Sequence, residues 1–148
     1  MKTLTLMAIA LLVGGVLPLQ SAINSRLGQV LSHPLQASFI SFLGGTIGLL
    51  AVLTLIRPEF PSPALIRSQP WHLFVGGLLG AAYVTMIITV APKIGIANTL
   101  TASIAGSIIV SVIFDHFGLM GMPIKVINLP RIIGSAGMLI SLFLIQKG

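Results

Sequence analysis

The chain has 148 residues, of which 55% are hydrophobic and only 7% are charged. A soluble domain carries about 25% charged residues, so this composition excludes a water-soluble globule and makes lipid the expected solvent. A net charge of +6 would suggest nucleic acid as the partner of a soluble protein. Here the basic residues are scattered through short connections, as topology signals are in membrane proteins, and we expect no nucleic-acid partner.

Five apolar segments are long enough to cross a bilayer, which takes about 20 helical residues. Pro, Gly and charged residues separate them, in RPEFPSPALIRSQPW, in a predicted tight turn PKIG at 92–95, and in DHFGLMGMPIKVINLPR at 115–131. The last connection is apolar enough to lie on the interface or partly re-enter the membrane. The sequence therefore predicts an all-α integral membrane protein with one transmembrane domain, residues 1–148, and spans near 3–25, 34–56, 72–91, 96–114 and 131–146.

The first span ends in LPLQSAINSRLG. At 100° per residue, Gln20, Ser21 and Asn24 share one side of the helix with small residues, and Pro18 predicts a kink that frees a backbone carbonyl. A primary amide left unpaired in hydrocarbon is costly. Gln20 and Asn24 should therefore face either a solute cavity or a partner on another helix, and both interpretations stay open. Arg26 either extends to the lipid headgroups or holds an anionic group at a cavity mouth.

The same segment also has the features of a signal peptide: Lys2, an apolar run from Leu4 to Val16, and a passable cleavage site at QSA. The apolar run continues past that site, so we expect a spanning helix instead. A cleaved chain would still hold four spans.

Glycine recurs in the second, third and fifth spans. Because lipid provides no hydrophobic drive between helices, small residues at helical spacing let two backbones approach closely. We therefore predict helix-packing faces at Gly44, Gly48, Gly76, Gly80 and Gly134.

The fourth span carries hydroxyl side chains at four-residue spacing, among them Thr99, Ser103 and Ser107. Such hydroxyls either line a cavity or bond to the carbonyl of the preceding turn, and both interpretations stay open. Asp115 and His116 end this span and form a candidate proton or metal site. An interfacial helix-end pair is the simpler interpretation, because adjacent residues do not share a helix face.

Acidic residues are missing from all five predicted spans. A pump that exchanges cations for protons needs a carboxylate inside the membrane, so the sequence favours a neutral polar or anionic solute. Without cysteine, a metal-ligand cluster or a nucleophile–base pair, we expect no metal, no cofactor and no enzymatic activity. The predicted substrate-binding residues are Gln20, Ser21, Asn24, Arg26, Thr99, Ser103 and Ser107.

Basic residues also predict the orientation. With five spans, five of them lie on the side of the N-terminus and three on the other side. The positive-inside rule makes the N-terminal side cytoplasmic. The difference is small enough for the chain to insert in both orientations.

Five stretches, in this order, resemble the YdcZ-like family of small five-span bacterial inner-membrane proteins in the drug/metabolite transporter superfamily: PLQSAINSRLG, HPLQASFISFLGGTIGLL, WHLFVGGLLGAAYVTMIITVAPKIGIA, SVIFDHFGLMG and RIIGSAGMLI. The chain departs from the family pattern at Ser107, where glutamine often follows Ala-Gly. Larger members of the superfamily have ten spans in two halves, and the resemblance implies that this chain is equivalent to one half.

A five-span unit is inverted relative to its duplicated twin, and inverted repeats around a midplane site are the usual frame for alternating access. We therefore expect an antiparallel dimer in the inner membrane, formed with a second copy or an oppositely oriented paralogue and surrounded by lipid. It would act as a secondary transporter or exporter of a small molecule, with Gln20 and Asn24 of both protomers lining a shared cavity. The alternative is a non-transporting subunit whose glycine faces dock another membrane protein.

Overall fold

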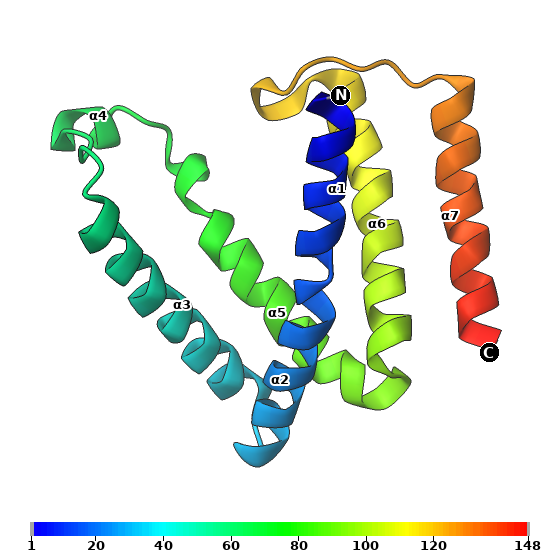
Figure 1. Cartoon of the computed structure of the whole chain (residues 1–148), viewed down its shortest axis with the longest axis horizontal. Helices are drawn as coiled ribbons and strands as arrows, with labels where there is room; N and C mark the ends of the chain where they lie inside the picture. Colours follow the sequence, from blue (N-terminus) through cyan, green and yellow to red (C-terminus); the bar gives the residue numbers. More distant parts are fainter. Residues whose placement is uncertain (1, 148) are drawn as a thin grey trace. The chain divides into compact units, whose positions relative to one another are not determined.

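The computed structural model describes residues 2–147, except for the side chain of Lys2 (Figure 1). Lys2 is one of the basic residues that predict the orientation. All regular elements in this range are helical, which confirms the all-α fold class. Five of its helices are long and apolar enough to cross a membrane, as the sequence predicts. The elements are α1 (Lys2–Gly14), α2 (Val16–Val30), α3 (Pro34–Ile56), α4 (Pro63–Arg67), η1 (Trp71–Phe74), α5 (Gly76–Ile94), α6 (Ile96–Phe117), η2 (Leu119–Gly121) and α7 (Leu129–Lys147).

The chain divides into two compact units, residues 1–92 and 93–148. The first unit contains α1 to α4, η1 and nearly all of α5. The second contains α6, η2 and α7. Both units hold membrane-spanning helices, and the single transmembrane domain over the whole chain stays a prediction.

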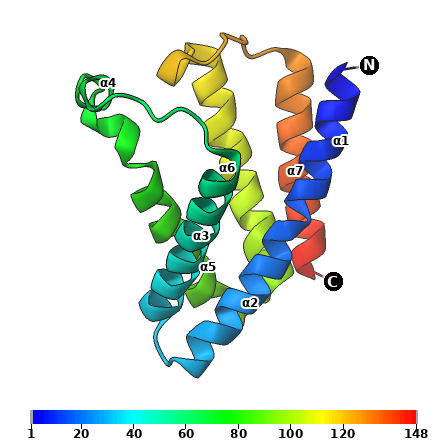
Figure 2. The ribbon, with the colours of Figure 1, turned by 60° about the vertical axis from the view of Figure 1, so that its left-hand side comes forward.

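Two successive helices, α1 and α2, make up the first span (Figure 2). Pro18 has no amide proton to donate to the carbonyl of Gly14, four residues earlier. The Gly15 amide contacts the Leu11 and Leu12 carbonyls at 3.3 and 3.1 Å, which tightens the last turn of α1. The interruption expected near Pro18 therefore lies just before it, and α2 continues past the predicted end of the span to Val30.

The third span differs from its prediction at both ends. It enters through the short helix η1 and becomes α-helical only at Gly76. At the other end, α5 continues through Pro92 to Ile94, because the fixed φ of proline fits a helix and only one hydrogen bond is lost. The turn is confined to Gly95, whose φ of 88° and ψ of 153° are essentially restricted to glycine.

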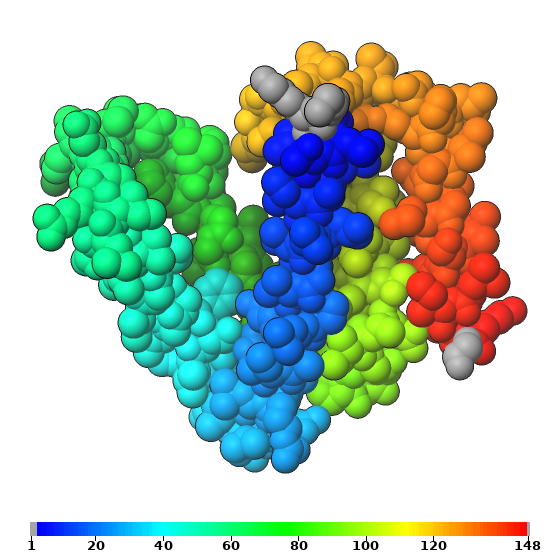
Figure 3. Space-filling view, viewed as in Figure 1, coloured from blue at the N-terminus to red at the C-terminus, as the bar shows by residue number. Residues whose placement is uncertain are grey.

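The pattern of buried and exposed side chains in the first unit is typical of a protein in lipid. The buried positions of α2 are small or polar: Ser21, Asn24, Ser25 and Gly28. Every residue from 3 to 20 is exposed, including all of α1 after its first residue, and Figure 3 shows one face of this helix in dark blue. Since hydrocarbon solvates leucine well, close contact between the helices depends on small side chains and hydrogen bonds.

Gly28 lies at a close approach between helices of the first unit. A Cβ atom at this position would lie 2.6 Å from Cγ2 of Ile88 and 3.7 Å from Cβ of Ala37. Glycine is therefore required where α2 meets α3 and α5.

The predicted packing glycines have different surroundings. A Cβ atom at Gly80 would contact the Phe42 ring at 3.4 Å. At Gly44, Gly48, Gly76 and Gly134 it would meet no described atom within 4 Å. These four glycines therefore make no close packing within the described chain, and contact between them and another membrane helix stays a prediction.

The connection from α6 to α7 is fastened to the end of α6. Arg131 donates from Nη2 to Oδ2 of Asp115 at 2.6 Å and from Nη1 to the Lys125 carbonyl at 2.9 Å. The Lys125 amide donates to the Asp115 carbonyl at 2.8 Å, and the Ile127 amide donates to Nδ1 of His116 at 3.2 Å. These bonds fix the route of the connection, and its predicted place on the membrane interface stays a prediction.

Candidate solute-binding site

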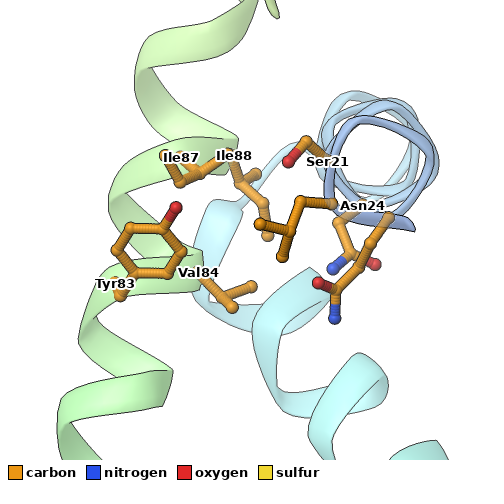
Figure 4. A pocket seen from close by; sticks show the side chains of 8 residues that line it. Ser21, Asn24, Tyr83, Val84, Ile87 and Ile88 are labelled. Atoms are coloured by element: carbon orange, nitrogen blue, oxygen red, sulfur yellow. The ribbon is translucent and has the colours of Figure 1, made fainter. Parts of the chain in front are cut away.

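Three of the predicted residues, Gln20, Ser21 and Asn24, lie together in one pocket of the first unit (Figure 4). They follow one another along α2, on the side that faces α5, where helical spacing places them. Leu17 completes the α2 side, and α5 supplies Tyr83, Val84, Ile87 and Ile88. No charged side chain lines this pocket.

The polar groups of the pocket are only partly bonded to the protein. Asn24 is 5% exposed and donates from Nδ2 to Oγ of Ser41 on α3 at 3.0 Å. Its Oδ1 is left to accept a hydrogen bond. Ser21 is 8% exposed, and neither its hydroxyl nor the Gln20 amide bonds to another described residue. Asn24 therefore makes the hydrogen bond to a neighbouring helix that one interpretation predicts. Its place in a solute cavity stays a prediction.

In this form the pocket is nearly closed. Its volume is about 10 Å³, which is close to the minimum for one water molecule. Ile87 and Ile88 are 7% and 3% exposed and form a dry wall on the α5 side. A solute larger than water enters only if α2 and α5 move apart.

A polar seam of two interhelical hydrogen bonds lies beside the pocket. The first bond is that between Asn24 and Ser41, and the second joins Thr85 Oγ1 on α5 to Ser38 Oγ on α3 at 2.8 Å. Thr85 also donates to the Ala81 carbonyl at 2.7 Å. The seam connects α2, α3 and α5. The spacing of Ser38 and Ser41 shows that they share a face of α3, but nothing in the sequence identifies their partners.

Arg26 does not line the pocket. It is exposed and donates from Nη1 to Oε1 of Gln29 at 3.4 Å. Six residues of helix rotate it about 240° from Gln20, so it points to a different side of α2 from the pocket. Its predicted contact with an anionic solute stays a prediction.

The hydroxyl ladder of α6 belongs to the second unit. Thr99 donates to the Gly95 carbonyl at 2.7 Å, and Ser107 donates to the Ser103 carbonyl at 2.9 Å. These bonds match the interpretation in which the hydroxyls bond to the preceding turn. A role for Thr99, Ser103 and Ser107 in solute binding stays a prediction.

Asp115 and His116 are both occupied by the α6–α7 connection, through Arg131 and the Ile127 amide. These bonds match a structural role at the helix end, the simpler of the two interpretations, and its place at the membrane interface stays a prediction. A proton-carrying role for the pair stays a prediction. Within residues 2–147, no three His, Cys, Asp or Glu side chains are grouped so that they could hold a metal ion.

Five spanning helices and an uncharged polar pocket define a small multi-pass membrane protein with the features of a transporter. The sequence profile described as "Putative inner membrane exporter, YdcZ" matches residues 5–144, and the chain belongs to this family. It is 25% identical over 146 residues to the "Inner membrane protein YdcZ" of Escherichia coli (strain K12), covering 99% of this chain and 97% of that protein. No solved structure matches the chain.

Membership of this family confirms the resemblance seen in the sequence and the location in the inner membrane. It also supports an exporter role, and therefore transport rather than catalysis. The family description names no solute.

Proposed function

We propose that this protein exports a small uncharged polar solute and works as an antiparallel dimer. One observation carries the proposal: Gln20, Ser21 and Asn24 converge on one pocket of a spanning helix and keep unused hydrogen-bonding groups there. Amides and hydroxyls offer both donors and acceptors. They can therefore replace the hydration shell of an uncharged solute as it leaves water.

Charge supports an uncharged solute over an ion. A cation at the midplane needs a compensating carboxylate, and no acidic residue lines the pocket. An anion is less well matched than the sequence suggests, because Arg26 lies on another side of α2. An anionic solute would need positive charge from outside this pocket.

Export requires the pocket to open, and two features of the first unit favour opening. Interhelical hydrogen bonds in membranes contribute about 0.6 kcal/mol on average, so the bonds Asn24–Ser41 and Thr85–Ser38 can exchange for bonds to a solute at low cost. The first span also lacks one backbone hydrogen bond near Gly15, because Pro18 has no amide proton to donate. A helix bends more easily where such a bond is missing.

A dimer is proposed because one chain leaves helix faces without partners. Gly44, Gly48 and Gly76 would accommodate a Cβ atom freely, which leaves room for close approach by a second membrane helix. The nearly balanced distribution of basic residues permits opposite orientations of the two copies. The same open faces favour the second candidate function, a non-transporting subunit that docks another membrane protein.

Flux into vesicles that contain only this chain tests the proposal. We expect Asn24→Leu to lower the flux of uncharged polar solutes, while the purified protein stays folded. Ser41→Ala is the matched variant, because it removes the same hydrogen bond and keeps the pocket amide. Transport that falls equally in both variants would show that the bond matters rather than the amide. Wild-type vesicles without flux for any small solute would favour the docking subunit.

The antiparallel dimer is tested by labelling single cysteines from each side of the membrane. The chain contains no native cysteine. Ser62→Cys and Lys147→Cys should each react from both sides if the two orientations coexist. Strictly one-sided labelling of both positions would exclude the antiparallel homodimer and leave an oppositely oriented paralogue as the partner.

A further inference from the structure

We propose that the second unit carries a binding site of its own for small uncharged solutes, between α6 and α7. A pocket of about 90 Å³ lies where the first turn of α6 meets the last turn of α7. Its lining combines three polar side chains with three apolar ones: Asn98, Thr101, Gln146, Ile94, Ala102 and Leu142. None of these residues has a role predicted from the sequence.

The polar side chains keep hydrogen-bonding capacity for a ligand. Asn98 donates from Nδ2 to the Ile94 carbonyl at 2.9 Å, and Thr101 donates to the Ala97 carbonyl at 2.7 Å. Oδ1 of Asn98 and the lone pairs of Thr101 are left as acceptors. The Gln146 amide bonds to no other described residue, so its two N–H groups and its carbonyl are all available.

The volume sets the size of the ligand. A water molecule occupies about 30 Å³ in the liquid, so the pocket has room for roughly three waters or for a small polyol such as glycerol. The pocket is open on one side, because Ile94, Ala102 and Gln146 are exposed. Polar pockets of this size fill with water, and their amides are costly unless water or a solute bonds to them.

Charge restricts the ligand to uncharged molecules. No charged side chain lines the pocket, so an ion would find no counter-charge there. Lys93 and Lys147 belong to the same end of the unit and would repel a cation. The acidic residue of this unit, Asp115, lies 17 positions further along α6 than Asn98, which is about 25 Å of helix.

The test uses Ala102→Cys, a small change in the pocket lining of a chain without native cysteine. A charged methanethiosulfonate reagent modifies only thiols that water reaches. Because Ala102 lies on the exposed side of the pocket, the charge of the reagent can stay in water. Ala102→Cys should therefore react, whereas Ile104→Cys, which is 45% exposed on the apolar surface, should not. Ser62→Cys in the α3–α5 loop controls for the reactivity of the reagent itself.

Glycerol is the probe of solute binding. It should slow the modification of Ala102→Cys in a saturable way, about threefold at twice its Kd by mass action. Trehalose at equal osmolality is too large for the pocket and should have no effect beyond that seen at Ser62→Cys. Asn98→Leu combined with Gln146→Leu should dry the pocket and lower the reactivity of Ala102→Cys roughly tenfold.

Two results would overturn the proposal. An unreactive Ala102→Cys would show that the pocket is dry, and a reactive one that glycerol fails to protect would show that it holds water alone. The inference does not depend on the proposed export. Labelling requires no transport, so a failed flux experiment would not affect the labelling result. A failed labelling experiment would likewise not affect the proposed export.

Discussion

The two units place polar side chains among lipid-facing helices in different ways. In the first unit, Ser21 and Asn24 are more than nine-tenths buried, and the pocket they line is nearly closed. In the second unit, Asn98 and Gln146 line a pocket about nine times larger at the end of a helix pair.

The two units also differ in what holds their helices together. The first depends on a glycine at a close approach and on hydrogen bonds between uncharged side chains. The second has an ion pair, Asp115–Arg131, that fastens its connection. Asn24, which is buried within the first span, has its partner on another helix, as an amide in lipid needs. Amides at a helix end can keep water instead.

The largest effect is expected at this close approach in the first unit. Gly28→Leu should destabilise the fold by about 3 kcal/mol, because its side chain collides with Ile88 and Ala37. Thermal unfolding in detergent measures the loss. Gly44→Leu is the matched control and should leave the unfolding of a single chain unchanged, because no described atom of another element lies within 4 Å of its Cβ position.

Gly44→Leu also tests whether this glycine packs against a second chain. If Gly44 packs against a second copy, the variant should lose dimerisation while the single chain stays folded. Equal unfolding temperatures for Gly28→Leu and wild type would show that the packing of α2 on α5 is loose, and would remove the contrast between the units.

A smaller effect is expected at the ion pair of the second unit. Asp115→Asn should cost at most about 1 kcal/mol, since Arg131 and Asp115 are partly exposed, at 28% and 33%. The freed connection should be cleaved by trypsin after Lys125 about fivefold faster. Glu59→Gln, which removes a carboxylate from the α3–α5 loop, should change neither property.

The same variant tests the candidate proton site. If the ion pair is only structural, vesicles with Asp115→Asn should keep the flux of the wild type. Loss of flux with an unchanged fold would instead make Asp115 part of the coupling mechanism.

No effect is expected on the transport of cationic compounds, because the two pockets share an uncharged lining. Neither pocket has a charged lining, so quaternary ammonium compounds and cationic dyes should be poor substrates. Cells that express the protein should show no added resistance to them. Saturable, proton-driven efflux of a permanent cation that survives Asp115→Asn would contradict this expectation and the charge argument behind it.

The sequence determined the solvent, the helical class and the number of spans, because each follows from local composition. A run of about 20 apolar residues must satisfy its backbone hydrogen bonds within one helix in lipid, whatever surrounds it. The common face of Gln20, Ser21 and Asn24 follows from helical periodicity alone. The break near Pro18 is local for the same reason, because proline lacks the proton that the Gly14 carbonyl needs.

Tertiary structure decided which of these residues have partners. Nothing local distinguishes Gly28, where a Cβ atom would collide with Ile88, from Gly44, where a Cβ atom would meet no described atom of another element within 4 Å. Asn24 bonds to Ser41, 17 residues away, and Gln146 on α7 lines the same pocket as Asn98 on α6. In a membrane, leucine is as well solvated outside a protein as inside it. Hydrophobicity therefore does not select the inner face of a helix, and only the three-dimensional fit of small and polar side chains does.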